Sequence, residues 1–266
     1  SSHSFPALYM WKEEMGLSLC LKNALFVIRH GAVSHSCYFF PCGDRAHVRT
    51  FIQHMLCLHG KSLMFQYIPE SGKAFLEAEF PGVFFLSEDR DAFEYIFSSE
   101  EQAKLAGGKF KHIRKEINHV KKERNFYLEV ISSDNLAQVK AITLAWNSAH
   151  SDGTALFYAD VEPVLSLIDA FSALGLYGVL IRDDMDYCGY VLGSPLSADT
   201  FDIHASKCSV NTEGLDYYCK QLFFQHIKSQ FPYVNREEDL GIEGLRMRKM
   251  GLHPMCLTPI WKATVI

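Results

Sequence analysis

Hydrophobic and polar positions along the first part of the chain recur at two spacings, about two residues and about 3.6 residues, which are typical of strands and helices. After Asp44, apolar residues at Val48, Ile52 and Met55 recur at helical spacing, and aspartate is a residue type that begins helices. The pattern predicts, in chain order, a helix over 5–14, strands over 17–21, 24–29 and 36–40, a helix over 44–59, a strand over 62–68, a helix from 69, and strands over 83–86 and 92–97.

The rest of the chain repeats this order. It predicts a strand over 127–131, helices over 135–150 and 161–174, strands over 178–182, 187–193 and 200–206, a helix over 213–229, a strand over 233–235, a short helix, and a final strand over 255–265. Helices, a three-strand antiparallel meander, and then helix, strand, helix, strand is the element order of the GNAT acyltransferase fold. We therefore predict an α/β (α+β) protein with two tandem GNAT-like domains, over 1–98 and 125–266, whose sheets are mixed and mostly antiparallel.

The predicted connection, residues 99–124, contains an amphipathic helix that is rich in positive charge. Between Lys109 and Arg124 there are seven Lys and Arg residues against two Glu residues, in a chain whose formal net charge is −5. Two interpretations stay open: a solvated bridging helix, or a surface that contacts the phosphate backbone of a nucleic acid. The candidate contact residues on one face of this helix are Lys111, Arg114, Lys115, Asn118 and Lys122.

A second charged stretch joins the short strand 233–235 to the helix that follows it. Asp239 is placed to begin that helix, and Arg246 has Glu243 as its neighbour one turn earlier. Arg236 suits a carboxylate or a phosphate, whereas Glu237, Glu238 and Asp239 suit an amino group. A capped surface helix with solvated charges is the alternative. The candidate substrate-binding residues are Asn235, Arg236, Glu237, Asp239, Glu243 and Arg246.

Composition excludes several classes of protein. The chain has 266 residues, of which 48% are hydrophobic, so it has enough material for one large or two moderate domains. Its negative net charge argues against a globally basic nucleic-acid binder. The eight cysteines include no CxxC pair, which favours buried reduced thiols over disulfides. No apolar run approaches the roughly 20 residues of a membrane span and no signal peptide is recognisable, so we expect a cytoplasmic protein, at most peripheral to the inner membrane face.

Several segments resemble one bacterial family. They are residues 97–107, Lys109–Arg114 and Ile117-Asn118 in the linker, the stretch Tyr233–Arg246 with His253-Pro254 behind it, and Ser4–Trp11 in the first helix. These resemble the proteins related to the C-terminal domain of phosphatidylglycerol lysyltransferase, over nearly the whole chain. The resemblance implies kinship with enzymes that move an aminoacyl group from aminoacyl-tRNA to a lipid headgroup, and more distantly with enzymes that add amino acids to peptidoglycan peptides.

The chain departs from that family pattern at two places. Where Arg-Asn-His-Ile-Asn is expected, the chain has Arg114-Lys-Glu-Ile-Asn118, and where His-x-Glu-Lys is expected, it has His204-Ala-Ser-Lys207. Ser206 thus replaces a carboxylate on the strand before the long helix. His204 and Lys207 remain the candidate catalytic residues, since either is a candidate base and Lys207 has the charge to stabilise an oxyanion.

Cofactor motifs are weak or missing. An acetyl-CoA enzyme of this fold has a glycine-rich turn before the long helix, whereas the junction 207–215 contains the single glycine Gly214, and Glu213 competes with a phosphate there. Acyl-CoA stays open as a donor. There is no HExxH motif and no zinc-type His/Cys spacing, so no metal is predicted. The leading hypothesis is an aminoacyltransferase-like protein; the alternatives are a catalytically inactive GNAT-like binding module and an acyl-CoA-dependent N-acyltransferase.

Overall fold

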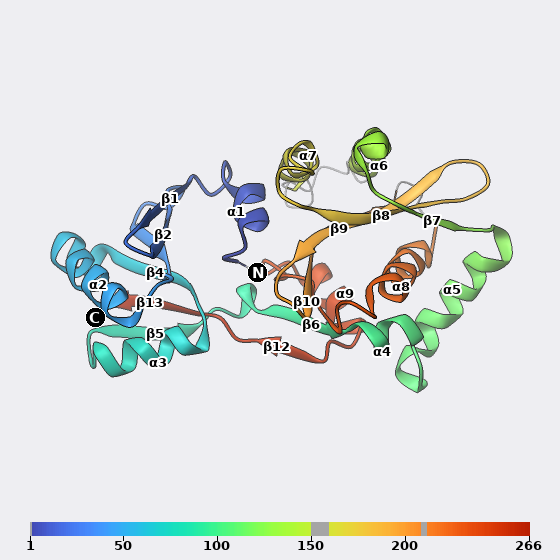
Figure 1. Ribbon diagram of the computed structural model, residues 1–266. Coiled ribbons are helices and arrows are strands. Elements are labelled where there is room, and N and C mark those ends of the chain that lie inside the picture. The colour runs from blue at the N-terminus through green and yellow to red at the C-terminus, as the bar shows by residue number, and fades with distance from the viewer. Residues whose placement is uncertain (1, 150–159, 209–211) are drawn as a thin grey trace.

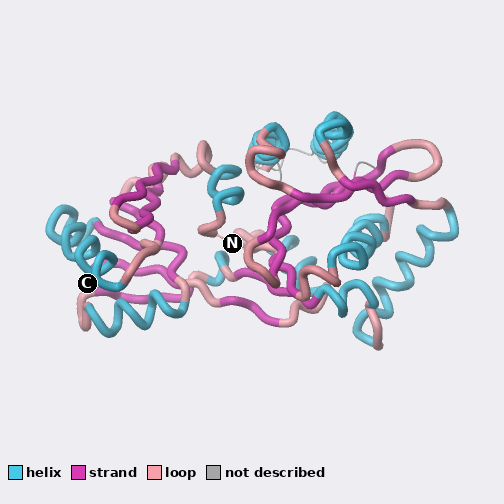
Figure 2. Tube along the Cα trace, viewed as in Figure 1, coloured by secondary structure: helices cyan, strands magenta, loops and turns pink. Residues whose placement is uncertain are grey.

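The computed structural model describes residues 2–149, 160–208 and 212–266, and forms two lobes that lie side by side (Figures 1 and 2). The elements up to the linker are α1 (Phe5–Trp11), β1 (Leu17–Lys22), β2 (Leu25–His30), β3 (Ser36–Phe39), α2 (Arg45–His59), β4 (Leu63–Ile68), α3 (Glu70–Glu79), β5 (Phe84–Glu88), β6 (Glu94–Ser98), α4 (Ser99–Lys104) and α5 (Lys111–Glu123). The remaining elements are β7 (Tyr127–Val130), α6 (Leu136–Ala149), α7 (Val161–Asp169), β8 (Tyr177–Arg182), β9 (Tyr187–Pro195), β10 (Thr200–Cys208), α8 (Leu215–Ile227), β11 (Tyr233–Asn235), α9 (Glu243–Gly251), β12 (Cys256–Thr258) and β13 (Trp261–Val265).

Each lobe contains one mixed sheet. The first has the strand order β1-β2-β3-β4-β13-β5, and the second has the order β12-β6-β11-β10-β9-β8-β7. Among the described strands, the parallel pairs are β3 with β4 and β10 with β11, and each pair is connected through a helix, α2 or α8. The predicted mixed α/β class with mostly antiparallel sheets is therefore confirmed.

The two sheets exchange one strand each. The last strand, β13, lies between β4 and β5 of the first sheet, whereas β6 lies between β11 and β12 of the second. The single strand predicted over 255–265 is two strands, because Pro259 between them has no N–H for a ladder hydrogen bond. Each sheet thus takes a strand from the other predicted segment, and the domain bounds 1–98 and 125–266 stay a prediction.

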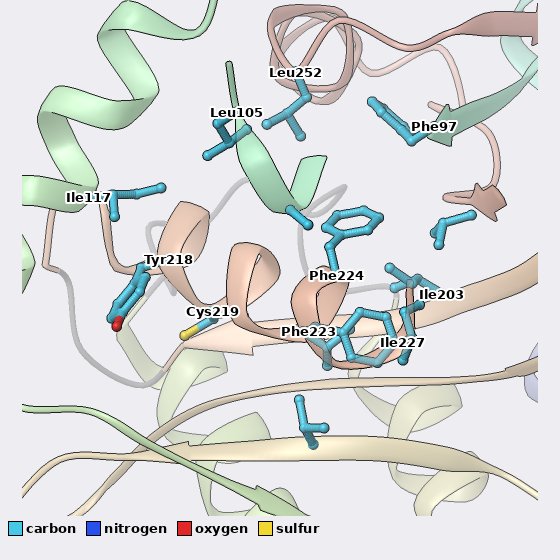
Figure 3. Close-up of a cluster of buried hydrophobic side chains, with 14 of the residues drawn as sticks. Phe97, Leu105, Ile117, Ile203, Tyr218, Cys219, Phe223, Phe224, Ile227 and Leu252 are labelled. Carbon is cyan, nitrogen blue, oxygen red and sulfur yellow. The ribbon is translucent and has the colours of Figure 1, made fainter. Parts of the chain in front are cut away.

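Helices cover both faces of the second sheet. On one face, α4, α5 and α8 enclose a core that includes Phe97, Phe223 and Phe224 (Figure 3). On the other face, α6 and α7 pack over a second core (Figure 1), which also receives Met10 from α1. Burial of each large apolar side chain contributes about 1.5–3 kcal/mol, so these layers fix the position of the strands between them.

Helix α1 connects the lobes. Ser4 begins it, because the Ser4 hydroxyl accepts a hydrogen bond from the amide of Ala7. Leu8 packs against Ile28 of the first sheet, whereas Met10 packs into the second lobe. This short helix therefore spans the boundary and forms one wall of the space between the lobes.

The cysteines are free thiols, as predicted, but their burial differs from the prediction. Cys37, Cys188 and Cys219 are buried. The expectation of buried thiols is wrong at four exposed positions, two in edge strands, one at an isolated β-bridge and one in helix α2: Cys20, Cys256, Cys42 and Cys57.

Candidate functional site

Strand β10 contains a β-bulge at the residue predicted to be catalytic. Its pairing with β9 jumps from Ile203 to Ala205, which leaves His204 as the extra residue. The partner strand has Gly193 at this point, where an added Cβ would lie 1.9 Å from the carbonyl oxygen of Asp202. Because a bulge changes the direction of a side chain, the glycine and the bulge together direct His204 towards the end of β11.

A buried lysine fixes the backbone of the loop after β11. Strands β10 and β11 pair only over Thr200–Asp202 with Tyr233–Asn235 within the described part of the chain, and the backbone then leaves the sheet. The ammonium of Lys249 on α9 is buried and donates hydrogen bonds to three successive carbonyl oxygens, at 2.6, 3.2 and 2.5 Å, those of Arg236, Glu237 and Glu238. This clamp fixes the loop without using the carboxylates of its two glutamates.

Four polar side chains meet at the bulge. Nδ1 of His204 lies 2.8 Å from Oε1 of Glu237 and 3.9 Å from Oδ2 of Asp202. Nε2 of the same ring lies 2.9 Å from Oγ of Ser194. The side chains of His204 and Asp202 are both 0% exposed, so Glu237 is the member of the cluster that reaches towards solvent.

Burial changes the ionisation of this region. It raises the pKa of Asp202 to about 8, with a further contribution from the negative charge of Glu237. Burial also raises the pKa values of Glu237 and Glu238 to about 7 each. Burial lowers the pKa of His204, against the opposing effect of Asp202, and lowers the pKa of Lys249 to about 8. Groups that titrate near neutral pH in a cleft are typical of functional sites.

Two cavities lie between residues of the two lobes near the end of β11. One, of 260 Å³, is lined by Glu237 and Glu238 together with residues of α1 and the first sheet. The other, of 480 Å³, has Glu94 of β6 in its wall. Ser2 and Tyr67 line both cavities. The site is therefore a space with an acidic wall at the end of β11 and an apolar wall from α1.

Asn235, a predicted substrate-binding residue, supports this wall from behind. Its amide nitrogen donates to Oε2 of Glu94 at 2.7 Å, and its amide oxygen accepts from the backbone N–H of Glu237 at 2.8 Å. Asn235 is 1% exposed and lines neither cavity. The structure therefore places it as a positioning residue for Glu237.

The sequence predicted that Asp239 begins helix α9, but it does not. The helix begins after Ile242, which has no side-chain cap. Asp239 is 0% exposed and its Oδ2 accepts hydrogen bonds from Arg90, Tyr95 and Arg246 at 3.0, 2.5 and 3.0 Å. Burial alone would raise the pKa of Asp239, but the hydrogen bonds from Arg246 and Tyr95 lower it to about 2. Asp239 is buried here because the exchanged strand β6 brings Tyr95 next to it.

Arg246 does not pair with Glu243, its neighbour one turn earlier. The Arg246 guanidinium binds Asp239 at 2.8 Å and Asp91 at 2.7 Å instead. Glu243 is exposed in the first turn of α9 and lines neither of the two cavities. The hydrogen bonds of Arg246 thus join α9 to the segment before β6.

Arg236 and Lys207 lie apart from the acidic wall. Arg236 lies over the ring of Phe97, 5.5 Å from its centroid, and burial lowers the pKa of Arg236 to about 10. Lys207 binds Asp160 at 2.8 Å and lies 3.7 Å from the ring centroid of Trp146, on the α6–α7 side of the sheet. The structure thus brings His204 to Glu237 and Asn235, but it places Lys207 and Arg236 elsewhere.

The junction that would hold a CoA pyrophosphate is partly outside the described residues, since it includes 209–211. At its described end, an added Cβ on Gly214 would lie 2.7 Å from the backbone of Glu116. Asp216 follows in the first turn of α8 and forms an ion pair with the buried Lys220. A carboxylate therefore lies in the turn where an anionic ligand would compete with it.

Comparison with known proteins identifies the relatives of the chain. Residues 1–264 match the family model described as phosphatidylglycerol lysyltransferase, C-terminal. The chain belongs to this family. None of the curated proteins compared with the chain shows a significant match.

Solved structures show the same fold. A conserved protein of unknown function from Bacteroides thetaiotaomicron has a TM-score of 0.88 at 25% identity, over 100% of this chain and 91% of that one. L-PGS from Bacillus licheniformis has a TM-score of 0.66 at 13% identity, over 97% and 90%. FemX has a TM-score of 0.62 at 8% identity, over 98% and 91%. The predicted tandem GNAT-like fold and family resemblance are thus confirmed.

The linker helix of this family member, α5, presents a positive stripe to solvent. Lys111, Lys115, Asn118 and Lys122 are exposed at helical spacing, and within the described part of the chain no ion pair involves the three lysines. Arg114 is different: it donates hydrogen bonds to carbonyl oxygens after the end of α4, one of them at 2.7 Å. Four of the five predicted contact residues are therefore accessible. Among the described helices, none has both the length and the apolarity needed to cross a bilayer.

Sequence reasoning missed three members of the site. Asp202 lies two residues before His204 on a predicted strand, where side chains share a face, and this spacing was an available signal. Ser194 and Glu94 gave no such signal, because they reach the site through sheet pairing. The three potential metal ligands Asp202, His204 and Glu237, whose ligand atoms lie within 4.8 Å of one another, are likewise spread over 36 positions (202 to 237).

Proposed function

We propose that this protein is an aminoacyltransferase that takes its aminoacyl group from aminoacyl-tRNA. The observation that carries the proposal is the pair of glutamates, Glu237 and Glu238, in the wall of the 260 Å³ cavity between the lobes. A half-buried carboxylate pair complements the α-amino group, which is the positive charge common to aminoacyl esters. The family membership supports the same interpretation.

The tRNA and its aminoacyl end would bind to two different surfaces of the protein. The stripe of Lys111, Lys115 and Lys122 would contact phosphates of the tRNA, while the cavity would hold the aminoacyl end. The other wall of the cavity is built by α1 and includes Leu8 and Trp11, which suits the aliphatic part of an amino acid or of an acceptor.

The chemistry requires positioning more than activation. The donor is already an ester, so a nucleophilic amine or hydroxyl of the acceptor attacks the ester carbonyl, a new C–N or C–O bond forms, and the C–O bond to the tRNA breaks. The proton of the nucleophile must leave, and the 3′-oxygen of the tRNA must gain one. Glu237, with a pKa of about 7 and His204 behind it, is suited to pass that proton at neutral pH.

A transfer assay tests the proposal. Full-length protein is mixed with tRNAs charged with labelled amino acids and with three acceptors in parallel: anionic phospholipid vesicles, a peptidoglycan-type peptide with a free amine, and buffer alone. We expect acceptor-dependent movement of label, and at least a tenfold loss in Glu237→Gln, since general acid–base groups contribute about 10²–10⁴ in rate. Label that stays on tRNA with every acceptor contradicts the proposal, and acyl transfer from a CoA thioester in a parallel assay would assign the alternative donor.

A further inference from the structure

The cluster at the β10 bulge has the donor set of a metal site. Nδ1 of His204 and one carboxylate oxygen each from Asp202 and Glu237 lie within 4.8 Å of one another, with measured separations from Nδ1 of 2.8 Å to Glu237 and 3.9 Å to Asp202. Ligand atoms about 2.0–2.2 Å from one ion lie about 3–4 Å apart. The 3.9 Å pair already has this spacing, and the hydrogen-bonded 2.8 Å pair has to open slightly to admit an ion.

The buried carboxylate of Asp202 lacks a hydrogen-bond partner among the described residues. Its side chain is 0% exposed, and neither carboxylate oxygen has a hydrogen-bond partner among residues 2–149, 160–208 and 212–266. A buried carboxylate without a partner is costly, and buried charges are normally paired or bound to metal. Its Oδ2 lies 3.9 Å from Nδ1 of His204, and the same Nδ1 lies 2.8 Å from Oε1 of Glu237, so the three side chains meet at one point.

The histidine is also prepared for coordination. Its Nε2 lies 2.9 Å from the buried hydroxyl of Ser194. If Nε2–H donates to that oxygen, Nδ1 carries the lone pair, and this is how a second hydrogen bond fixes the tautomer of a metal-binding imidazole. Glu237 borders the 260 Å³ cavity, which gives an ion a route to the cluster.

We propose that Asp202, His204 and Glu237 bind a divalent transition-metal ion of the Mn²⁺ or Zn²⁺ kind. One imidazole with two carboxylates suits these ions better than Mg²⁺ or Ca²⁺, which prefer oxygen ligands alone. The local charge favours a cation, since Glu94 and Glu238 add two carboxyls beside Glu237. The chain's α-amino group and the ammonium of Lys249 oppose this charge, and Lys249 is engaged by three backbone carbonyls. The metal site shares Glu237 with the proposed aminoacyl site, so it deepens that proposal, while Glu238 stays on the cavity wall for the amino group. Metal binding is measured without any transfer assay, so either proposal can fail alone.

Isothermal titration of the metal-stripped full chain with MnCl₂ and with ZnCl₂ tests the proposal. We expect one ion per chain at this site, and at least a tenfold weaker affinity in Asp202→Asn and in His204→Gln. Ser194→Ala should weaken binding by about 10-fold or more, as loss of an outer-shell partner does. The matched control is Glu123→Gln, which removes the carboxylate of the exposed His119–Glu123 pair and should leave the affinity unchanged.

Three results would overturn the site. The first is the absence of Mn²⁺ and Zn²⁺ binding by the wild type. The second is an affinity of Asp202→Asn and His204→Gln equal to that of the wild type. The third is a parallel titration in which alanine amide binds in an Asp202-dependent way but neither metal does. The last would assign the cluster to an ammonium group. Thermal melting in EDTA shows whether each variant is folded. If Asp202→Asn does not fold, Glu237→Gln, which changes the ligand on the cavity wall, is titrated in its place.

Proton release gives an independent readout. A metal ion must displace the proton that now lies between His204 and Glu237, so binding should release protons. Titrations in buffers of different ionisation enthalpy measure this number. We expect net release at pH 7 for the wild type, and metal binding without net proton release would contradict the proposal.

Discussion

The hydroxyl of Tyr95 donates a 2.5 Å hydrogen bond to Asp239, although the two residues are 144 positions apart. Tyr95 belongs to β6, the strand that the first segment contributes to the second sheet. The same carboxylate accepts from Arg90 and Arg246, so one buried acid joins the segment before β6, the strand itself and helix α9. This point holds the exchanged strand against the loop that carries the acidic wall.

Replacing Asp239 by alanine should therefore destabilise the protein strongly. The change leaves two arginines without their shared carboxylate, and breaking a buried ion pair costs about 3–5 kcal/mol of unfolding free energy. Asp169→Ala is the control: Asp169 pairs with Lys140 but its side chain is 63% exposed, and loss of such a pair costs up to about 1 kcal/mol. Urea unfolding of both variants measures the difference, and equal losses would contradict the assignment.

The fold could be predicted from the sequence where its signals are local. The helix after Asp44 is an example, since the Asp44 carboxylate accepts hydrogen bonds from the amides of Ala46 and His47. The exchange of β6 and β13 could not be predicted in this way. Strand pairing between segments far apart in the chain leaves no trace in the period of apolar residues, which reports only which face of each strand is buried.

The residues of the site likewise divide into those that local sequence signals predict and those that depend on distant partners. His204, Asn235 and Glu237 were predicted because they lie at the ends of neighbouring strands, where ligands bind in α/β folds. Asp239 was misassigned as a helix cap because the residues that bury it, Arg90 and Tyr95, lie far away in the sequence. A charge run next to a helix has the same sequence pattern whether it is solvated or buried, and only the tertiary partners distinguish the two cases.

The bulge at His204 should depend on the glycine that faces it. Gly193→Ala would place a Cβ 1.9 Å from the carbonyl oxygen of Asp202, so the strands must separate, and we expect a loss of about 2–4 kcal/mol. Gly244→Ala in α9 is the matched control, because its Cβ would meet no atom within 4 Å and alanine favours a helix by about 0.5–1 kcal/mol. Denaturant unfolding should show opposite signs for the two changes.

Asp202 should make the stability of the metal-free protein fall as pH rises. With a folded pKa of about 8 against about 3.9 in the unfolded chain, the folded state holds a proton that the unfolded state lacks between about pH 4 and pH 8. An asparagine side chain does not titrate, so Asp202→Asn should reduce the loss of unfolding free energy across this window. Urea unfolding at pH 5 and pH 8 in EDTA is the measurement, and parallel pH curves for both proteins would refute the prediction.

Glu238 should distinguish charged from uncharged tRNA. A hydrogen bond to a charged group contributes about 1.5–3 kcal/mol, so Glu238→Gln should reduce the preference for aminoacyl-tRNA by about 10- to 100-fold. Because the pKa of Glu238 is raised to about 7, the preference should grow as pH rises through 7, until the α-amino group loses its own proton near pH 8. Glu243→Gln, on the exposed first turn of α9, should bind like the wild type in the same filter-binding assay.

The stripe on α5 should provide the salt-dependent part of tRNA binding. Reversing the charge of Lys111, Lys115 and Lys122 removes up to three phosphate contacts, and each contact contributes about 0.7–0.9 to the slope of log affinity against log salt. We therefore expect the slope to fall by about 2–3, for charged and uncharged tRNA alike. The matched control is the triple change Lys22→Glu, Arg29→Glu and Lys61→Glu, which alters the net charge equally on the other lobe. If both triple variants lose affinity to the same extent, the effect reflects total charge, and α5 is not the tRNA surface.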